Sequence, residues 1–342
     1  MDKSTPWLNH IIKASIALAF CVILIGAYTR LSDAGLGCPD WPGCYGQLSA
    51  PTTESEITQA QSAFPQSPVD ITKAQTEMTH RYFAESLGCL ILCIAILAFM
   101  NRKRTHLPVW LPSILVFLVI GQGILGMWTV TLKLLPLVVM SHLLGGFCTL
   151  SLLWLCWLFL RFPTLPKANI PNNLSYLAMT TLLVLFLQIA LGGWTSANYA
   201  ALICPDFPLC QGKLLPNMSV KAFNMLGAIG ISEPLAFMDA VEKTTIHVSH
   251  RFGALITLLL GSFLSFRLYQ ISKQNPSSRK LLIGCSHAIT FLLLIQVCLG
   301  ISNVVMHLPL SIAVMHNGIA VLLLLTLITT NYVLIKSRSH DE

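Results

Sequence analysis

Four histidines stand at matching places in a chain that is otherwise dominated by apolar residues: His80, His142, His250 and His316. Each lies at the start of a long apolar segment, and an ionisable residue in a membrane-spanning segment is costly and usually functional. Two imidazoles on neighbouring helices of a four-helix bundle can supply both axial nitrogens to haem iron. A zinc site instead needs three or four ligands in one cluster. The histidines therefore predict two haem sites with two ligands each.

An internal repeat supports this pairing, because the unusual residues recur in the same order. The segment CPDWPGCYGQL begins at Cys38 and CPDFPLCQGKL begins at Cys204, an offset of 204 − 38 = 166. THRYF at 79–83 matches SHRFG at 249–253, and a further matched set is Gln122, Gly126 and His142 with Gln296, Gly300 and His316. Such a repeat defines the architecture of a chain. Four separately satisfied histidines would not explain why each copy carries the same two.

The two copies differ beside the first histidine of each pair. Glu77 lies three residues before His80, so both share one face of a helix. The repeat places His247 at the corresponding position of the second copy. An acid beside a porphyrin can move protons or stabilise developing positive charge. We therefore predict chemistry at Glu77 in the first half and a permanent electron-transfer haem in the second.

An arginine directly follows the first histidine of each pair, at Arg81 and Arg251. Their guanidinium groups could pair with haem propionates at the outer membrane surface. Snorkelling of the long side chains to the interface is an equally good interpretation.

Four of the eleven cysteines lie in the long connections between apolar segments. Cys38 with Cys44 and Cys204 with Cys210 share the spacing C-x5-C, which is compatible with a disulfide. Disulfides can form and persist on the outer face of a bacterial cytoplasmic membrane. We favour bonds that staple the loops over the haem sites. The alternative is that Cys38 and Cys44 take part in redox exchange linked to the reaction.

Composition places these residues in a bilayer. Of the 342 residues, 54% are hydrophobic and only 10% are charged, and the mean hydropathy is +0.70. A soluble domain carries about 25% charged residues, and a spanning helix needs roughly 20 apolar residues. Eight segments reach that length, at about 10–30, 81–100, 108–130, 138–160, 174–196, 247–268, 280–303 and 312–335.

The net charge of +7 indicates topology and does not imply a nucleic-acid partner. Lysines and arginines gather at the termini and in alternate connections, as at 102–104, and most acids lie in the other connections. By the positive-inside rule, both termini are cytoplasmic and the acidic loops lie outside. The first segment is expected to be a retained anchor, because no clean small-residue cleavage site follows it.

The predicted fold is all-α: a polytopic membrane protein whose eight transmembrane helices form two pseudo-symmetric four-helix bundles. The first unit covers 1–165 and the second covers 166–342. Four helices per unit is an even number, so the repeat is parallel about an axis along the membrane normal. Two long outer loops, at about 31–79 and 197–245, are candidates for function. The apolar stretch 220–231 is compatible with an interfacial helix or with a plain loop.

The residues that carry these patterns resemble those of one family, the haem A synthases. The similar segments are GAYTRLSDAGLGCPDWPGC at 26–44, EMTHRYFAESLG at 77–88 and the H-x-x-H-R-F run from His247. Together with the histidines that open the fourth and eighth segments, the resemblance covers nearly the whole chain. It is to the bacterial type with cysteine pairs in two outer loops.

The resemblance implies an enzyme that oxidises the C8 methyl group of haem O to a formyl group, giving haem A for respiratory terminal oxidases. It implies that Glu77 is the catalytic carboxylate, that haem O lies in the first unit and that a haem B cofactor lies in the second. The implied substrate-site residues are His80, His142 and Arg81, and the cofactor-site residues are His250, His316 and Arg251. A methyl group offers no acidic proton, so its oxidation needs redox-metal or radical chemistry.

The expected partners are haem O, membrane lipid, a haem O synthase, an electron donor and assembly factors of terminal oxidases. A homo-oligomer is compatible with the sequence, and no nucleic acid is expected. The expected location is the bacterial cytoplasmic (inner) membrane, with multiple passes, both termini in the cytoplasm and the haem sites toward the outer face.

Three other classes compete with this interpretation. A di-haem cytochrome b-type electron carrier would hold two permanent haems B. A membrane thiol oxidoreductase would use the cysteine pairs but would leave the four histidines unexplained. A haem transporter or chaperone would bind the ring without altering it. Only the synthase should carry haem O, a hydroxylated intermediate or haem A beside haem B.

Overall fold

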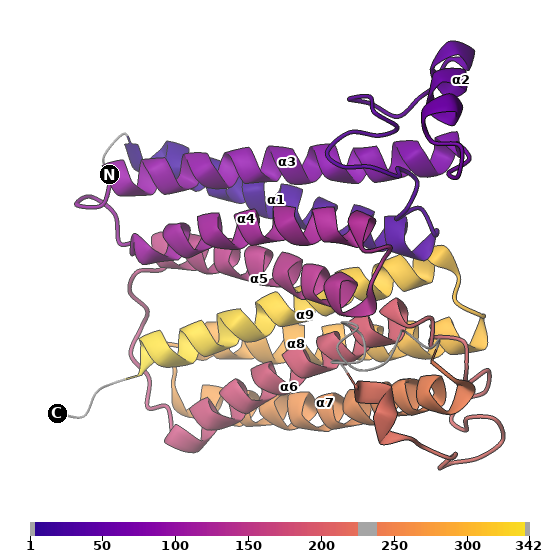
Figure 1. The fold of residues 1–342 in the computed structure, drawn as a ribbon. Helices are drawn as coiled ribbons and strands as arrows, with labels where there is room; N and C mark the ends of the chain where they lie inside the picture. Colours follow the sequence, from indigo (N-terminus) through magenta and orange to yellow (C-terminus); the bar gives the residue numbers. More distant parts are fainter. Residues whose placement is uncertain (1–3, 225–237, 339–342) are drawn as a thin grey trace. The chain divides into compact units, whose positions relative to one another are not determined.

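The computed structural model describes residues 4–224 and 238–338. These residues form nine α-helices and one short 3-10 helix (Figure 1). The elements are α1 (Ser4–Leu31), α2 (Glu54–Ala63), α3 (Ile71–Met100), α4 (Trp110–Thr131), α5 (Pro136–Arg161), α6 (Asn172–Ala197), η1 (Val220–Phe223), α7 (Ala240–Gln274), α8 (Arg279–Val305) and α9 (Leu310–Ser337). Within the described ranges the only β pairings are isolated bridges.

Every α-helix except α2 is long and apolar enough to cross a membrane, which gives eight candidate spans among the described residues. The prediction of an all-α, multi-pass membrane protein is therefore confirmed. Only helices and closed barrels satisfy every backbone hydrogen bond within hydrocarbon. The apolar composition of these segments thus requires the helical solution that the structure shows.

Two of the histidine-bearing helices begin earlier than predicted. The α3 helix starts 81 − 71 = 10 residues earlier and α7 starts 247 − 240 = 7 residues earlier. The side chain of Asp70 caps α3 by accepting from the backbone N–H of Lys73, and Asp239 forms a capping box with Glu242. Polar first turns carry no hydropathy signal, so the prediction missed them. His80 and His250 therefore lie inside their helices and do not begin them.

The first predicted outer loop also contains a helix, α2. Thr53 and Glu56 form a capping box at its start, which satisfies backbone N–H groups that the first turn leaves free. In the second outer loop, η1 covers the beginning of the apolar stretch 220–231. The rest of that stretch, from residue 225, lies outside the described residues.

Spatial proximity divides the described chain into two compact units, with the division inside α5 between Leu153 and Trp154. The N-terminal unit comprises 4–104 and 108–153, and the C-terminal unit comprises 105–107, 154–224 and 238–338. In the N-terminal unit, α3 packs against α1 and α4. In the C-terminal unit, α6 contacts α7 and α9, while α8 contacts the same two helices. Those four helices therefore form a closed bundle.

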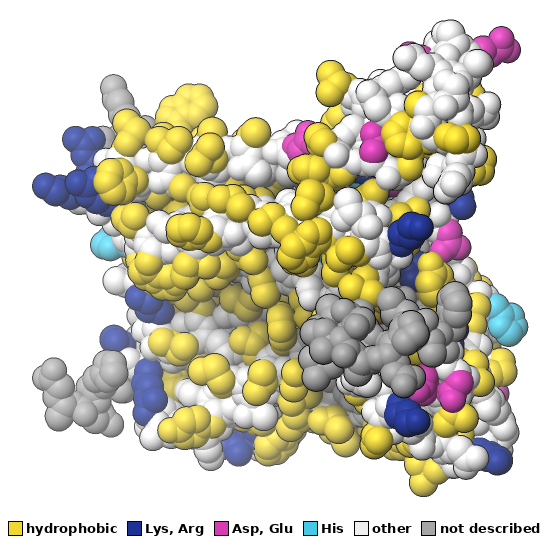
Figure 2. Space-filling model, viewed as in Figure 1, with side chains coloured by type: hydrophobic (Ala, Val, Ile, Leu, Met, Phe, Trp, Pro, Cys, Tyr) yellow, Lys and Arg dark blue, Asp and Glu magenta, His cyan; other side chains and the backbone are white. Residues whose placement is uncertain are grey.

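Charged side chains concentrate at the ends of the helices. In the N-terminal unit, basic side chains gather beyond the end of α3, and acidic side chains lie around α2 at the opposite end (Figure 2). Hydrophobic side chains cover the length of the helices between them. This distribution suits helices whose middle sections face lipid and whose ends face water.

Candidate functional site

Each of the four histidine rings lies against a glycine of a neighbouring helix. A Cβ atom placed on Gly26 of α1 would lie 2.7 Å from Cε1 of His80, closer than any side chain tolerates. The corresponding distances are 3.5 Å for Gly126 and His142, 3.2 Å for Gly192 and His250, and 3.3 Å for Gly300 and His316. Small residues let membrane helices approach closely. The duplicated glycines therefore make room for the duplicated histidines.

The N-terminal unit brings His80 and His142 together. Their ring centroids are 6.4 Å apart and their planes are nearly perpendicular, at 85°. The Nδ1 atoms of both rings are buried and have no hydrogen-bond partner. A buried polar nitrogen without a partner is unfavourable unless something else binds there or uses the ring. The pair that the sequence predicted is thus present as a pair of incompletely satisfied imidazoles.

The C-terminal unit holds the second pair, His250 on α7 and His316 on α9. The Nε2 atom of Gln188 lies 3.0 Å from Nδ1 of His250 and donates to the His250 carbonyl at 2.9 Å. The Nε2 atom of Gln296 lies 3.2 Å from Nε2 of His316. Nδ1 of His316 is buried without a partner.

These surroundings fit a haem better than a clustered metal ion. All four rings are half-buried inside membrane-spanning helices, and three of them retain a buried, unpaired nitrogen. Among the described residues, no group of three or more His, Cys, Asp or Glu side chains could hold a metal ion. Two imidazoles per unit are what a flat macrocycle with two axial positions requires. A surface hollow of about 330 Å³ lies elsewhere, beside Tyr176 and Arg267, and contains none of these histidines.

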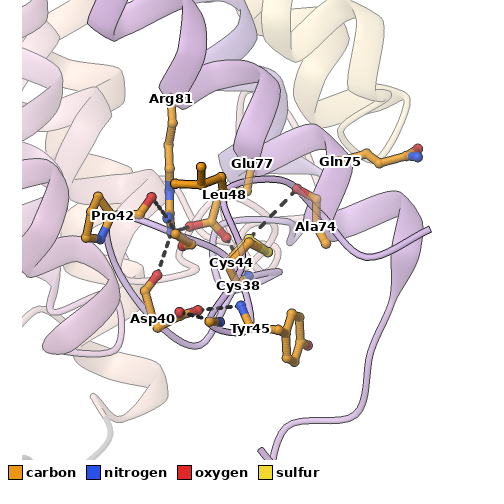
Figure 3. Close-up of a disulfide and its surroundings, with 12 residues drawn as sticks. Cys38, Asp40, Pro42, Cys44, Tyr45, Leu48, Ala74, Gln75, Glu77 and Arg81 are labelled. Atoms are coloured by element: carbon orange, nitrogen blue, oxygen red, sulfur yellow. Dashed lines mark hydrogen bonds and ion pairs between the residues drawn. A yellow bond between two sulfur atoms is a disulfide. The ribbon is translucent and has the colours of Figure 1, made fainter. Parts of the chain in front are cut away.

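Glu77 lies on α3 one turn before His80, and its side chain is buried. Only 4% of the residue is exposed. One carboxylate oxygen accepts a hydrogen bond from the backbone N–H of Cys38 at 3.0 Å, and the other accepts from the guanidinium of Arg81 (Figure 3). A buried carboxylate needs such donors to be stable in an apolar environment. The acid is therefore held in place by its own helix and by the first cysteine loop.

Arg81 connects Glu77 to that loop. Its two terminal nitrogens donate to the carbonyl of Gly43 at 2.6 Å and to those of Pro42 and Asp40 at 3.1 Å (Figure 3). The guanidinium group thus uses its fork of donors on the loop backbone and on one carboxylate. In the structure this side chain positions the loop. The contact with haem propionates stays a prediction.

Both cysteine pairs are disulfides in the structure, Cys38 with Cys44 and Cys204 with Cys210. An aspartate shapes each loop from within. Asp40 accepts from two consecutive backbone N–H groups, those of residues 45 and 46, and Asp206 accepts from those of residues 211 and 212. The bond from the N–H of residue 212 is the main cause that lowers the pKa of Asp206 below its ordinary value. The two loops are built alike.

The C-terminal unit has a different side chain at the position of Glu77. His247 takes the place of Glu77, is only 4% exposed and has its Nδ1 atom 3.1 Å from the carbonyl oxygen of Ala200. Arg251 donates to the carbonyls of Leu209 and Cys204, at 2.7 and 3.1 Å. The scaffold of arginine and disulfide loop is therefore conserved within the chain, while the group beside the histidine pair is not.

The glutamine beside His250 was missed by the sequence reasoning. Gln188 stands four residues before Gly192, in the run QIALG. The same spacing occurs in QGILG at 122–126 and in QVCLG at 296–300. This recurring Q-x-x-x-G pattern was a usable signal, because residues four apart share one face of a helix.

Comparison with known proteins places the chain among membrane assembly factors of respiration. Residues 9–328 match the COX15-CtaA family, described as a cytochrome oxidase assembly protein. The chain is 49% identical to the Heme A synthase of Shewanella oneidensis over 329 residues, which is 96% of each protein. It is 26% identical to the Heme A synthase of Bradyrhizobium sp. strain BTAi1 over 337 residues, covering 93% of this chain and 87% of that protein. The similarity to the Heme A synthase of Agrobacterium fabrum is 26% over 345 residues, or 94% and 89%.

Proposed function

The chain belongs to the COX15-CtaA family of cytochrome oxidase assembly proteins, and from this premise we propose that it converts haem O to haem A by oxidising the C8 methyl group to a formyl group. The observation that carries the proposal is the unequal duplication. Two histidine pairs share one scaffold, but among the residues that the structure describes only the N-terminal pair has a buried carboxylate beside it, Glu77. The product would serve respiratory terminal oxidases.

We assign the substrate to the N-terminal half, 1–165, with His80 and His142 as the residues that would bind haem O. The C-terminal half, 166–342, would hold haem B through His250 and His316. When bound, that haem supplies one-electron transfer. The buried His247 and the glutamine contacts of the second pair support a site built to retain its ligand.

Glu77 is the residue that we propose acts on the substrate. Its carboxylate can take up a proton as the methyl carbon is oxidised, or stabilise positive charge that develops on the ring. The N–H of Cys38 and the guanidinium of Arg81 orient it. The disulfide loop would thereby act as a staple that keeps the acid in position and excludes water.

The protein is a multi-pass membrane protein, and we propose the bacterial cytoplasmic membrane as its location. The basic helix ends and both termini would face the cytoplasm, and the haem sites would lie toward the outer face. A haem O synthase, an electron donor and assembly factors of terminal oxidases are the partners that this role requires. Haem O and membrane lipid are the other proposed partners.

Mass spectrometry of extracted haems tests the proposal. The wild-type protein should yield haem B together with haem O, a hydroxylated intermediate or haem A. The Glu77→Ala variant should keep haem B and accumulate haem O. Two haems of type B in both preparations, without any haem O or haem A, would reject the synthase and favour a di-haem electron carrier.

The cysteine pair separates the synthase from a thiol oxidoreductase. If Cys38 and Cys44 only staple the loop, the double variant Cys38→Ala with Cys44→Ala should still form haem A once it is folded. Complete loss of haem A from a folded double variant that retains haem B would instead support redox exchange through these sulfurs. The four histidines, which a thiol oxidoreductase would not need, support the staple.

A further inference from the structure

One residue position distinguishes the surroundings of the four histidines. Four residues before each glycine that faces a histidine, the chain carries Val22, Gln122, Gln188 and Gln296. The helical spacing places each of these residues one turn away from the glycine, on the side that meets the neighbouring helix. Three of the four are glutamines. The exception is Val22 on α1, the helix that meets His80 at Gly26.

In the C-terminal unit both glutamines reach a histidine ring. The amide nitrogen of Gln188 lies 3.0 Å from Nδ1 of His250, and that of Gln296 lies 3.2 Å from Nε2 of His316. A Cβ on Gly253 would collide with Oε1 of Gln188, so this glycine leaves the space that the amide occupies. The contact is thus built from both helices.

In the N-terminal unit neither histidine ring has a side-chain hydrogen bond. Val22 has no polar atom in its side chain, and Nδ1 of His80 is buried without a partner. The amide of Gln122 lies instead against Gly145, where a Cβ would collide with its Nε2 atom. Nδ1 of His142 is also unpaired. The two units therefore differ in how firmly their histidines are oriented.

We propose that Gln188 and Gln296 are positioning residues that lock the histidines of the C-terminal unit onto a resident haem, and that Val22, which has no polar side-chain atom, leaves Nδ1 of His80 unpaired so that the N-terminal site exchanges its haem. This inference rests on the proposed division into a substrate site and a cofactor site. It names the residues that would make the C-terminal site retain its haem and the N-terminal site exchange its haem.

The physical basis is the hydrogen bond to the ring nitrogen that does not bind the metal. Such a bond fixes the tautomer and the orientation of a ligating imidazole, and its loss typically costs about 10–100-fold in affinity. A glutamine amide carries a donor and an acceptor at its two ends. In the structure the amide nitrogen faces each ring, which suits a ring nitrogen without a proton. The nitrogen of a ligating imidazole that does not bind the metal carries a proton, so each amide would have to turn and present Oε1, which is buried without a partner in both glutamines. A valine can provide neither group.

Haem loss measured on the full-length protein tests the proposal. In a His142→Ala background, the remaining haem belongs to the C-terminal unit, and its transfer to excess apomyoglobin can be followed by absorbance. We expect Gln188→Leu to accelerate this loss about 10–100-fold. Gln188→Glu should retain the haem and shift its midpoint potential to a more negative value, because a carboxylate acceptor makes the ligand more basic. Equal behaviour of the leucine and glutamate variants would reduce Gln188 to a packing residue and overturn the proposal.

The opposite substitution tests the other site. In a His316→Ala background loaded with added protohaem, Val22→Gln should slow haem loss about tenfold, since it supplies the missing amide. Gln122→Leu is the matched control and should leave the rate unchanged. An unaltered rate in Val22→Gln would overturn the proposal even if the Gln188 variants fail to fold. Absence of haem O and haem A from the wild type would reject the proposed function but would not alter these comparisons of haem loss.

Discussion

At the scale of single residues, the chain uses one scaffold with two different side chains in its centre. Arg81 and Arg251 donate to equivalent loop carbonyls, those of Gly43 and Leu209. Beside them the N-terminal copy has a carboxylate and the C-terminal copy has an imidazole. A buried carboxylate that is hydrogen-bonded in an apolar site is a candidate for proton transfer. In the proposed mechanism the chemistry depends on the one residue that differs between the copies, Glu77 or His247, because the arginine and the disulfide loop are shared.

We expect Glu77→Gln to lower the rate of haem A formation by about 10²–10⁴-fold, the usual range for loss of a proton-transfer group. The amide oxygen still accepts from the N–H of Cys38 but the bond from Arg81 is lost. Arg81 keeps its bonds to three loop carbonyls, so we expect folding and haem content to be largely retained. The ratio of haem A to haem O in extracts measures the effect. His247→Ala is the control in the second copy and should alter haem B content more than turnover. Equal loss of activity with unchanged haem in both variants would contradict the division of labour.

At the scale of helices, close approach at the glycines decides where the histidine rings lie. Gly26 of α1 meets His80 of α3, and Gly192 of α6 meets His250 of α7. A helical glycine costs roughly 1 kcal/mol relative to alanine in an exposed helix interior. Here that cost is offset by the space that a ring needs between two backbones. These glycines are therefore part of the site, although they have no side chain.

We predict that Gly26→Ala displaces His80 and lowers the haem content of the N-terminal unit, because the new methyl group would lie 2.7 Å from Cε1 of that ring. Gly123→Ala on α4 is the matched control, since nothing lies within 4 Å of its Cβ position. Haem content after purification and thermal unfolding followed by circular dichroism measure both variants. Equal haem content in the two would show that the ring tolerates the methyl group.

The α2 helix gives a prediction that depends on pH. The backbone N–H of Thr53, followed by that of Thr52, lowers the pKa of Glu56 from 4.5 to about 2. A depressed pKa means that the ionised form stabilises the cap. Its contribution is complete above about pH 4.5 and is lost as the pH falls toward about 2.

Hydrogen-exchange protection of the α2 amides should therefore fall in Glu56→Gln at neutral pH and in the wild type across that acidic window. Glu54→Gln, in the same first turn, is the control and should change the protection less, because the capping box does not include residue 54. Protection that is independent of pH between 4.5 and 2 in the wild type would contradict the role of Glu56.

At the scale of the whole molecule, duplication with an even number of spans gives both copies the same orientation in the membrane. In the proposed topology both cysteine loops would lie on the outer side, where disulfides can persist. The separation of basic and acidic side chains in the N-terminal unit agrees with that orientation (Figure 2). We therefore propose that the chemistry on both histidine pairs is directed to the outer membrane face.

Fusions to alkaline phosphatase, which is active only outside the cytoplasm, test this topology. The enzyme inserted between α2 and α3 of the full chain should be active, and the enzyme fused to the C-terminus should be inactive. A cytoplasmic fluorescent reporter at the same two positions should give the reverse pattern. Phosphatase activity at the C-terminus would invert the proposed orientation.

The sequence by itself determined the features that depend on local composition and on repetition. Hydropathy located all eight spans, because apolar length alone decides whether a helix can cross the bilayer. The repeat identified the two histidine pairs and the unequal residues Glu77 and His247. The sequence did not predict where α3 and α7 begin. Their first turns are polar and give no hydropathy signal, and the start of α3 depends on its cap, Asp70.

Only the tertiary structure decided what the polar side chains contact. The bond from Cys38 to Glu77 joins residues 39 positions apart, and the contact of Gln188 with His250 joins residues 62 apart. The packing of whole helices and loops sets such distances, and no local pattern encodes them. Arg81 illustrates the difference. Its charge and position suggested a propionate partner or the membrane interface, whereas packing placed loop carbonyls and a carboxylate within its reach.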